Sequence, residues 1–424
     1  MPSRIGLFPV AAGRGNQTML YRAFQAMDDL FAPLRLSAAI GRDVQTRLMG
    51  SLGQTPWLRR WGALNQLLLS GRMTFGRPDY QIREVLSGNA MVPVREVVAL
   101  DRPFGNLLHF AKEEGLVPQP KVLVVAPLSG HYSTLLRNTV ETLLRDHDVY
   151  ITDWKTARDV PVSAGTFGFD EYIDYIIDFL RELGPRSHVL AVCQPCVPTL
   201  AAVALMAQDK DPCQPRTMTL MGGPVDTRVA PTVVNQLATG YSYEWFKNNL
   251  IQTVPEPWDG HGRRVYPGFL QLTAFMGMNM GRHIEQFRRL YQALADAEEA
   301  EAAKITEFYE EYFAVLDMTE EFYLETIDKV FQRALLAKGE LEHRGRRIDC
   351  GAIQRTALLT VEGERDDICA VGQTAAAHLL CTGLRPHLKR HHLQPGVGHY
   401  GVFSGSKWER QIYPQVRNLV LAMS

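Results

Sequence analysis

One apolar segment that ends abruptly at a cysteine constrains the fold of this 424-residue chain more than any other feature. Residues 187–192 have the pattern of a buried strand, and the apolar residues 199–208 beyond Cys193 have that of a helix. A nucleophile on such a turn stands clear of the sheet only if its flanking residues are slim or suitably shaped. Ala191 is small, and Pro195 suits a first helical turn, where its missing N–H removes no bond. The segment therefore predicts a strand, a cysteine on a sharp turn and a helix.

The predicted turn also favours chemistry at the thiol. At the N-terminus of a helix, the dipole and the free N–H groups stabilise a thiolate, which is the reactive form of cysteine. The N–H of Gln194 would point at the oxyanion that forms when Cys193 attacks a carbonyl group. A buried structural cysteine is the alternative, because free cysteine is among the most buried residue types.

Cys193 and Cys196 also form a C-x-x-C pair, which is typical of thioredoxin-like redox sites and of half a zinc site. No second such pair exists in the sequence, and a thioredoxin-like unit would be a small domain near its own chain start. We therefore interpret Cys196 as a packing residue on the first helical turn. We expect no metal and no cofactor.

Charge and composition argue against several classes of protein. The formal net charge is −1 and there is no basic tract, which argues against nucleic acid as a partner. Six cysteines in a chain of this length suit a reducing compartment better than a disulfide framework. No apolar run is long enough for a transmembrane segment, and residues 1–17 do not resemble a signal peptide. We expect a cytoplasmic protein, with Met19 as an alternative natural start, and we leave open whether it forms a homo-oligomer.

Strand and helix patterns alternate through the middle of the chain. Residues 94–100 and 106–110 flank a Pro/Gly turn and predict an antiparallel hairpin. The sequence then predicts strands at 121–126, 149–153 and 217–221 besides the cysteine strand, with helices at 133–145 and 169–183. Later it predicts a strand at 356–361, a helix at 372–381, a strand at 391–393 and a closing helix capped by Ser406 and Glu409. This alternation implies a doubly wound, mostly parallel sheet.

The order of these patterns predicts an α/β-hydrolase fold. We assign its core to residues 93–230 and 348–424, and a largely helical cap (lid) insertion to residues 231–347. Residues 1–92 form an N-terminal extension and helical segment in this interpretation, with a helical pattern from residue 18 to about residue 89. Its apolar stripes either pack on the main domain or touch a hydrophobic particle surface.

Two further residues complete a candidate catalytic triad with Cys193. Asp366 lies on a tight turn directly after the strand at 356–361, where it would orient an imidazole; Asp367 is the alternative. His399 stands among the glycines of residues 396–401, so its loop is free to bend over the sheet edge. The chain order nucleophile, acid, base is that of α/β-hydrolases.

The loop after the strand at 121–126 predicts the rest of the site. In this fold the loop supplies a second oxyanion donor from its backbone, and we assign that role to the N–H of Leu128, with Ser129 second. His131 and Tyr132 follow in the same loop as candidate substrate contacts. The predicted cap adds an apolar set that suits a methyl-bearing substrate, although ordinary packing explains it equally well: Met276, Met278, Met280, Phe275, Trp245, Phe246 and Phe269.

Five short motifs carry a resemblance to a known family. They are Pro-Leu-Ser-Gly-His-Tyr at 127–132, Ile-Thr-Asp-Trp at 151–154, Ala-Val-Cys-Gln-Pro at 191–195, Gly-Glu-Arg-Asp-Asp-Ile at 363–368 and Gly-Val-Gly-His-Tyr-Gly at 396–401. Together they resemble the intracellular polyhydroxyalkanoate (poly-3-hydroxybutyrate) depolymerases of the cysteine type, from about Met19 to the C-terminus. Cys196 and residues 1–18 are the departures from the family pattern.

The resemblance implies hydrolysis of the ester bonds of amorphous polyester in cytoplasmic granules. It also implies a Cys nucleophile at Cys193, with the acid and the base at Asp366 and His399, and the polymer or granule surface as the partner. Three alternatives remain: a polyester synthase that uses hydroxyacyl-CoA, a soluble oligomer hydrolase, and a granule-coating protein without chemistry. The synthase is disfavoured because it typically shows Gly-x-Cys-x-Gly, and the coating protein would need no nucleophile turn.

Overall fold

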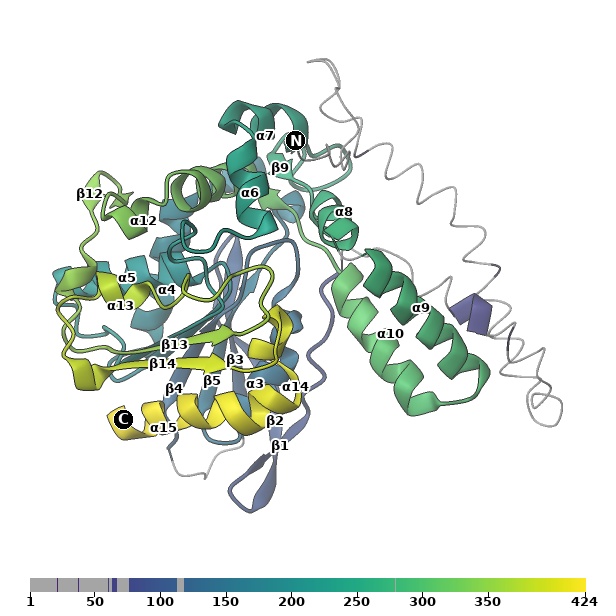
Figure 1. Ribbon diagram of the computed structural model, residues 1–424, viewed down its shortest axis with the longest axis horizontal. Helices are drawn as coiled ribbons and strands as arrows, with labels where there is room; N and C mark the ends of the chain where they lie inside the picture. The colour runs from purple at the N-terminus through teal and green to yellow at the C-terminus, as the bar shows by residue number, and fades with distance from the viewer. Residues whose placement is uncertain are drawn as a thin grey trace.

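The computed structural model describes residues 76–112, 118–278 and 280–424, together with residues 63–66 and the single residues Tyr21, Ser37 and Arg60 (Figure 1). Most of the N-terminal helical pattern therefore lies outside the described residues. From Gly76 onward that pattern was wrong, because residues 76–83 are not helical and the chain then forms the paired strands β1 and β2. The predicted boundary at residue 92 consequently falls inside β2.

The described chain is built on a nine-stranded sheet in the order β1-β2-β3-β5-β4-β6-β7-β13-β14. The pairs β1–β2, β2–β3 and β3–β5 are antiparallel. The remaining neighbours in the sheet, from β5–β4 to β13–β14, are parallel. This mostly parallel, helix-covered sheet confirms the predicted α/β-hydrolase fold. The strands are β1 (Glu84–Ser87), β2 (Ala90–Leu100), β3 (Gly105–Lys112), β4 (Lys121–Val125), β5 (Asp148–Trp154), β6 (His188–Val192), β7 (Thr217–Met221), β13 (Ala357–Gly363) and β14 (Lys389–Gln394).

Helices cover both faces of the sheet (Figure 1). On one face α4 (Phe169–Leu183) packs against α5 (Cys196–Gln208), and on the other α3 (Arg137–Leu144) packs against α15 (Tyr413–Met423). From Cys196 to Met206 every residue of α5 is buried, as expected for a helix that is apolar on all sides. The short helical turns are η1 (Ser133–Leu136), η2 (Ala157–Asp159), η3 (Val162–Ala164), η5 (Cys350–Ala352), η6 (Pro386–Leu388) and η7 (His399–Val402).

Two helix predictions near the C-terminus were wrong in detail. The helix predicted at 372–381 is confined to α13 (Ala377–Leu380). The buried Glu362 carboxylate accepts the backbone N–H groups of Gly372, Thr374 and Ala375, and this fixes the preceding residues as turns. Ser406 does not cap the closing helix, because it lies inside α14 (Gly405–Lys407), which continues through the π-helical η8 (Trp408–Ile412) into α15.

Between β7 and β13 the chain leaves the sheet and forms mostly helices. They are α6 (Val233–Gly240), α7 (Tyr243–Leu250), α8 (Gly268–Met278), α9 (Met280–Ala295), α10 (Glu299–Phe313), α11 (Glu320–Thr326), η4 (Ile327–Gln332) and α12 (Leu335–Lys338). Short strands interrupt them: β8 (Gln252–Thr253), β9 (Arg264–Tyr266), β10 (Met318–Thr319), β11 (Glu342–His343) and β12 (Arg346–Arg347). Helices α9 and α10 form a hairpin that projects from the sheet domain (Figure 1), with an apolar cluster of its own. Within the described residues, none of the helices combines the length and apolar character that crossing a membrane requires.

Candidate active site

Cys193 follows directly on β6 and adopts a backbone conformation that side-chain-bearing residues rarely take, with φ at +68°. Two hydrogen bonds hold it there: its N–H donates to the Met221 carbonyl at 2.7 Å, and its carbonyl accepts from the Cys196 N–H at 3.1 Å. The helix α5 begins only at Cys196, with Pro195 at the N-cap. Cys193 therefore stands on a strained turn just before the helix, with its side chain partly exposed.

His399 and Asp366 form a buried pair beside this turn. The imidazole Nδ1 lies 2.8 Å from Asp366 Oδ2, and the two side chains are 7% and 0% exposed. The other carboxylate oxygen accepts the N–H groups of Ile368 and Cys369 at 2.9 and 2.8 Å, which fixes its orientation toward the ring. The Cys193 side chain lies near enough to the His399 ring to help raise the pKa of the imidazole. The structure thus brings Cys193, His399 and Asp366 together, whereas Asp367 is exposed.

The charges around His399 favour its protonated form. Burial alone lowers the pKa of the imidazole, but the charges of Cys193 and Asp366 outweigh burial and raise that pKa well above its usual value. An imidazole that keeps its proton beside a sulfur atom stabilises a thiolate. This arrangement supports nucleophilic attack by Cys193.

Cys196 is a packing residue, as predicted. It is fully buried, and its thiol donates weakly to the carbonyls of Ala191 and Met221 at 3.4 and 3.7 Å. Burial raises its pKa, so the thiol is inert. A Cβ on Gly223 would lie 2.3 Å from this sulfur, so the close approach requires glycine at that position.

The loop between β4 and η1, which holds the predicted oxyanion donor Leu128, is tied down at its first residue. The Ala126 N–H donates to Thr152 Oγ1 at 2.9 Å, and its carbonyl accepts from Trp154 Nε1 at 2.8 Å and from the Tyr172 hydroxyl at 3.1 Å. Sequence reasoning missed this support. Its only signal was the Ile-Thr-Asp-Trp motif, which contains two of the three anchoring side chains.

The predicted oxyanion donor Leu128 already has a partner. Its N–H donates to the side-chain Oε1 of Gln194 at 3.3 Å. The Gln194 Nε2 is buried and has no hydrogen-bond partner among the described residues. Gln194 and the Leu128–Ser129 loop are therefore in contact, as an oxyanion hole requires. The side chain of Gln194, however, accepts the hydrogen bond of the Leu128 N–H, which is one of the predicted donors.

The predicted substrate contacts do not form one set. His131 is buried, its Nε2 lies 3.2 Å from the Tyr312 carbonyl in α10, and burial lowers its pKa to about 4, so the ring is neutral. Tyr132 is buried too. Met276 packs against the α9–α10 cluster, whereas Met280 is 50% exposed. The side chains of Phe275 and Met278 lie outside the described residues, and the binding role of the whole set stays a prediction.

Gly222 is a site residue that sequence reasoning missed. Its φ is +57°, and a Cβ there would lie 3.4 Å from both Asp366 Oδ2 and His399 Cε1. The positive φ favours glycine at this position, directly beside the acid–base pair. The available signal was the Gly-Gly-Pro run at 222–224, directly after the strand at 217–221.

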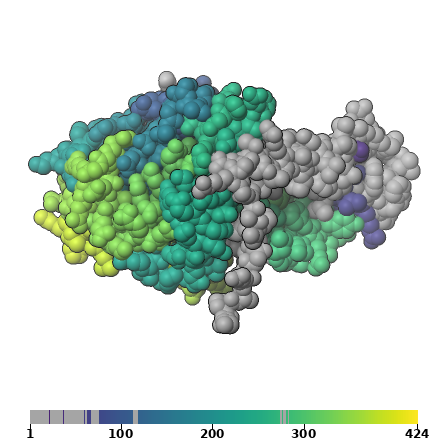
Figure 2. All heavy atoms as spheres, turned by 90° about the horizontal axis from the view of Figure 1, so that it is seen from above, coloured from purple at the N-terminus to yellow at the C-terminus, as the bar shows by residue number. Residues whose placement is uncertain are grey.

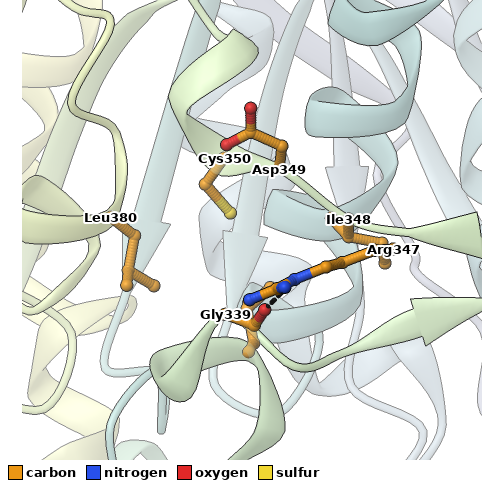
Figure 3. Close-up of a pocket in the computed structure, with 7 residues that line it drawn as sticks. Gly339, Arg347, Ile348, Asp349, Cys350 and Leu380 are labelled. Atoms are coloured by element: carbon orange, nitrogen blue, oxygen red, sulfur yellow. Dashed lines mark hydrogen bonds between the residues drawn. The ribbon is translucent and has the colours of Figure 1, made fainter.

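A separate cavity of about 380 Å³ lies near the second half of the insertion (Figure 3). None of the predicted site residues lines it; the lining residues are Leu336, Gly339, Arg347, Ile348, Asp349, Cys350 and Leu380. Over the described ranges, no group of three or more His, Cys, Asp or Glu side chains is arranged to hold a metal ion.

Comparisons with known proteins give a partial match. Residues 222–424 match the family model described as PHB de-polymerase C-terminus. No curated protein matches the chain. Among solved structures, the Paleococcus ferrophilus monoacylglycerol lipase is 13% identical, with 72% of this chain and 97% of that chain covered and a TM-score of 0.40. The 2-hydroxy-6-oxo-6-phenylhexa-2,4-dienoate hydrolase of Rhodococcus sp. strain RHA1 is 12% identical, with 77% and 99% covered and a TM-score of 0.39.

Proposed function

We propose that this chain, a carboxylic ester hydrolase whose residues 222–424 match the PHB de-polymerase C-terminus family model, cleaves amorphous intracellular poly(3-hydroxybutyrate) or a related polyhydroxyalkanoate. The observation that carries the proposal is the buried pair of His399 and Asp366, 2.8 Å apart, beside Cys193 on its strained turn. The proposed enzyme works in the cytoplasm at the granule surface. Residues 231–347 act as its cap.

In the first half-reaction the Cys193 sulfur attacks the carbonyl carbon of an ester in the polymer. The resulting oxyanion is held by backbone N–H groups of Gln194 and of Leu128 or Ser129. The His399 imidazolium then gives its proton to the departing alcohol oxygen, so that the C–O bond breaks and an acyl-thioester remains on Cys193. Asp366 holds the ring in the orientation and tautomer that this transfer needs.

In the second half-reaction water replaces the alcohol. Neutral His399 takes a proton from the water, whose oxygen attacks the thioester carbonyl. Collapse of this second oxyanion expels the Cys193 thiolate, which again faces the imidazolium formed when His399 took the proton. The products are a shortened chain and a 3-hydroxyacid monomer or oligomer. No step requires a metal or an organic cofactor.

The experiment that tests this proposal titrates acid release from artificial amorphous poly(3-hydroxybutyrate) granules. Alkylation with iodoacetamide, followed by mass spectrometry of the modified peptide, should label Cys193 and abolish acid release together. Cys213, which is also partly exposed, gives the matched control, and its Ser variant should lose activity on alkylation as the unmodified enzyme does.

Two results would contradict the proposal. Persistent acid release after complete alkylation of Cys193 would exclude the cysteine mechanism. Release of CoA from 3-hydroxybutyryl-CoA without acid release from granules would favour the synthase-like alternative instead.

A further inference from the structure

Four apolar residues spaced four apart line the surface before, along and directly after α6. Val229, Val233, Leu237 and Tyr241 are 37%, 62%, 37% and 38% exposed, and an exposed group of large apolar side chains is more informative than any one of them alone. Val371 is 39% exposed and belongs to the same surface, because a Cβ on its neighbour Gly372 would lie 2.8 Å from Val229. We call these five residues the α6 ridge. Figure 2 views the molecule from above, toward the face on which α6 and α7 lie in Figure 1.

Two of the five ridge residues, Val233 and Leu237, owe their exposure to the helical repeat of α6. Residues four apart lie on one face of a helix, so Val233 and Leu237 face solvent, while Asn235 and Ala238 are buried on the opposite face. The helix Val233–Gly240 contains no charged residue. At its end the Tyr241 ring stacks on the Trp245 ring, with centroids 4.1 Å apart, which extends the apolar surface. The exposed surface of α6 is thus uncharged and presents Val233 and Leu237, with the polar Gln236 and Thr239 exposed beside them.

Hydrogen bonds connect the ridge to the loop that carries Asp366. The Thr232 hydroxyl donates to the Ile368 carbonyl at 3.1 Å, and the Ile368 N–H donates to the Asp366 carboxylate. On the other side, Gln373 Nε2 donates to Asn235 Oδ1 at 2.8 Å and to the Val229 carbonyl at 3.0 Å. The ridge is therefore fixed next to the acid of the candidate triad.

We propose that the α6 ridge docks the enzyme on the surface of the solid polyester, an inference that rests on the proposed function. An exposed apolar surface next to a catalytic site is typical of an interaction site. A polyhydroxyalkanoate surface presents methyl, methylene and ester groups without formal charge, and the uncharged α6 face is complementary to it. Docking by the ridge brings the loop that carries Asp366 close to the polymer. It thereby places Asp366 and His399 near the esters that are cleaved.

The test compares two substrates for each variant. Acid release from amorphous poly(3-hydroxybutyrate) granules and hydrolysis of soluble p-nitrophenyl butyrate are measured together with sedimentation of the protein with granules. The ridge variants are Leu237→Ser and the double variant Val233→Asp/Leu237→Ser. An acidic residue suits the first turn of α6, so the double variant should fold. Leu421→Ser in α15 is the matched control, since Leu421 is also apolar and 46% exposed.

We expect the ratio of the granule rate to the soluble-ester rate to fall about tenfold in the double variant, with less protein sedimenting, because apolar burial at the polymer is lost. Leu237→Ser should show a smaller fall, and Leu421→Ser none. An unchanged ratio in both ridge variants would overturn the docking inference while leaving polymer hydrolysis intact. An equal loss of activity on both substrates would also overturn the docking inference, because the ridge would then only support the position of the loop that carries Asp366. If the unmodified enzyme cleaves the soluble ester but releases no acid from granules, the polymer function itself fails.

Discussion

The side-chain oxygen of Gln194 accepts a hydrogen bond from the backbone N–H of Leu128 at 3.3 Å. Leu128 lies in the loop after β4, and Gln194 directly follows the candidate nucleophile. An ester oxyanion that uses the Leu128 N–H must displace this carboxamide. The existing bond is long and neutral, whereas a bond to an oxyanion is charge-assisted and stronger, so the exchange favours the reacting ester.

The side chain of Gln194 should therefore compete mildly with substrate. Gln194→Ala removes the competing acceptor, and we expect kcat/KM on a soluble ester to rise about two- to tenfold, in line with a net hydrogen-bond contribution of about 0.5–1.5 kcal/mol. Steady-state kinetics on p-nitrophenyl butyrate measure the change. A loss of activity of more than about tenfold would instead mean that Gln194 positions the oxyanion loop.

The two cysteines of the C-x-x-C pair should behave differently. Cys193→Ala removes the nucleophile, and we expect ester cleavage to fall by about 10⁴-fold or more while the fold persists. Cys196→Ala removes a buried, hydrogen-bonded sulfur and should cost about 1 kcal/mol of unfolding free energy while most activity remains. Acid titration and urea unfolding of both variants check this pair. Losses in the reverse order would place the nucleophile at Cys196.

The neighbouring carboxylates Asp366 and Asp367 give a second matched comparison. Asp366→Asn places an amide against His399 Nδ1, which favours the wrong tautomer, and we expect kcat to fall by about 10²–10⁴-fold. Asp367→Asn changes an exposed side chain and should leave kcat within about twofold. Equal activity of the two variants would show that the orienting acid lies elsewhere.

The buried His131 should make stability depend on pH. Burial lowers its pKa to about 4, whereas histidine in an unfolded chain titrates near 6.5. As the pH falls from about 6.5 to 4, the unfolded chain binds a proton that the folded chain excludes, so this residue lowers stability on acidification. His131→Gln removes that proton uptake, and its amide is still able to donate to the Tyr312 carbonyl.

Urea unfolding at pH 7 and pH 5 measures the difference. We expect His131→Gln to lose less unfolding free energy than the unmodified protein, by up to about 1.4 kcal/mol per pH unit. The exposed His387→Gln should follow the unmodified protein. Parallel pH profiles of the unmodified protein and His131→Gln would mean that His131 is protonated in the fold.

The sequence allowed the prediction of features that depend on short stretches of chain. The apolar run before Cys193 and the apolar helix after it predicted β6, the turn and α5, because strand and helix periodicities are local. The carboxyl ends of parallel strands meet at one edge of a sheet, so the motifs at Asp366 and His399 were expected near Cys193. In the structure His399 is hydrogen-bonded to Asp366 and lies near Cys193.

Features that depend on contacts between distant residues were not predicted. The bond from Leu128 to Gln194 joins residues 66 positions apart, and no local pattern encodes it. The helix expected at 372–381 had a suitable pattern. The buried Glu362 carboxylate, however, accepts hydrogen bonds from the first N–H groups of that segment, which therefore forms a turn. The sequence singled out apolar residues of α7, α8 and α9 as substrate contacts, but it did not single out the exposed apolar residues of α6, because their exposure depends on tertiary packing.

The matched region, residues 222–424, begins one residue after β7 ends, and it contributes only β13 and β14 to the nine-stranded sheet. β13 lies between β7 and β14 and forms a continuous ladder with both. A fragment cut at that boundary would expose an unpaired, apolar strand edge and would contain the acid and the base without their sulfur partner. The parts of this polypeptide before and after residue 222 are therefore not interchangeable modules. To exchange either part with that of a relative, the contacts between β7 and β13 would have to be redesigned as well.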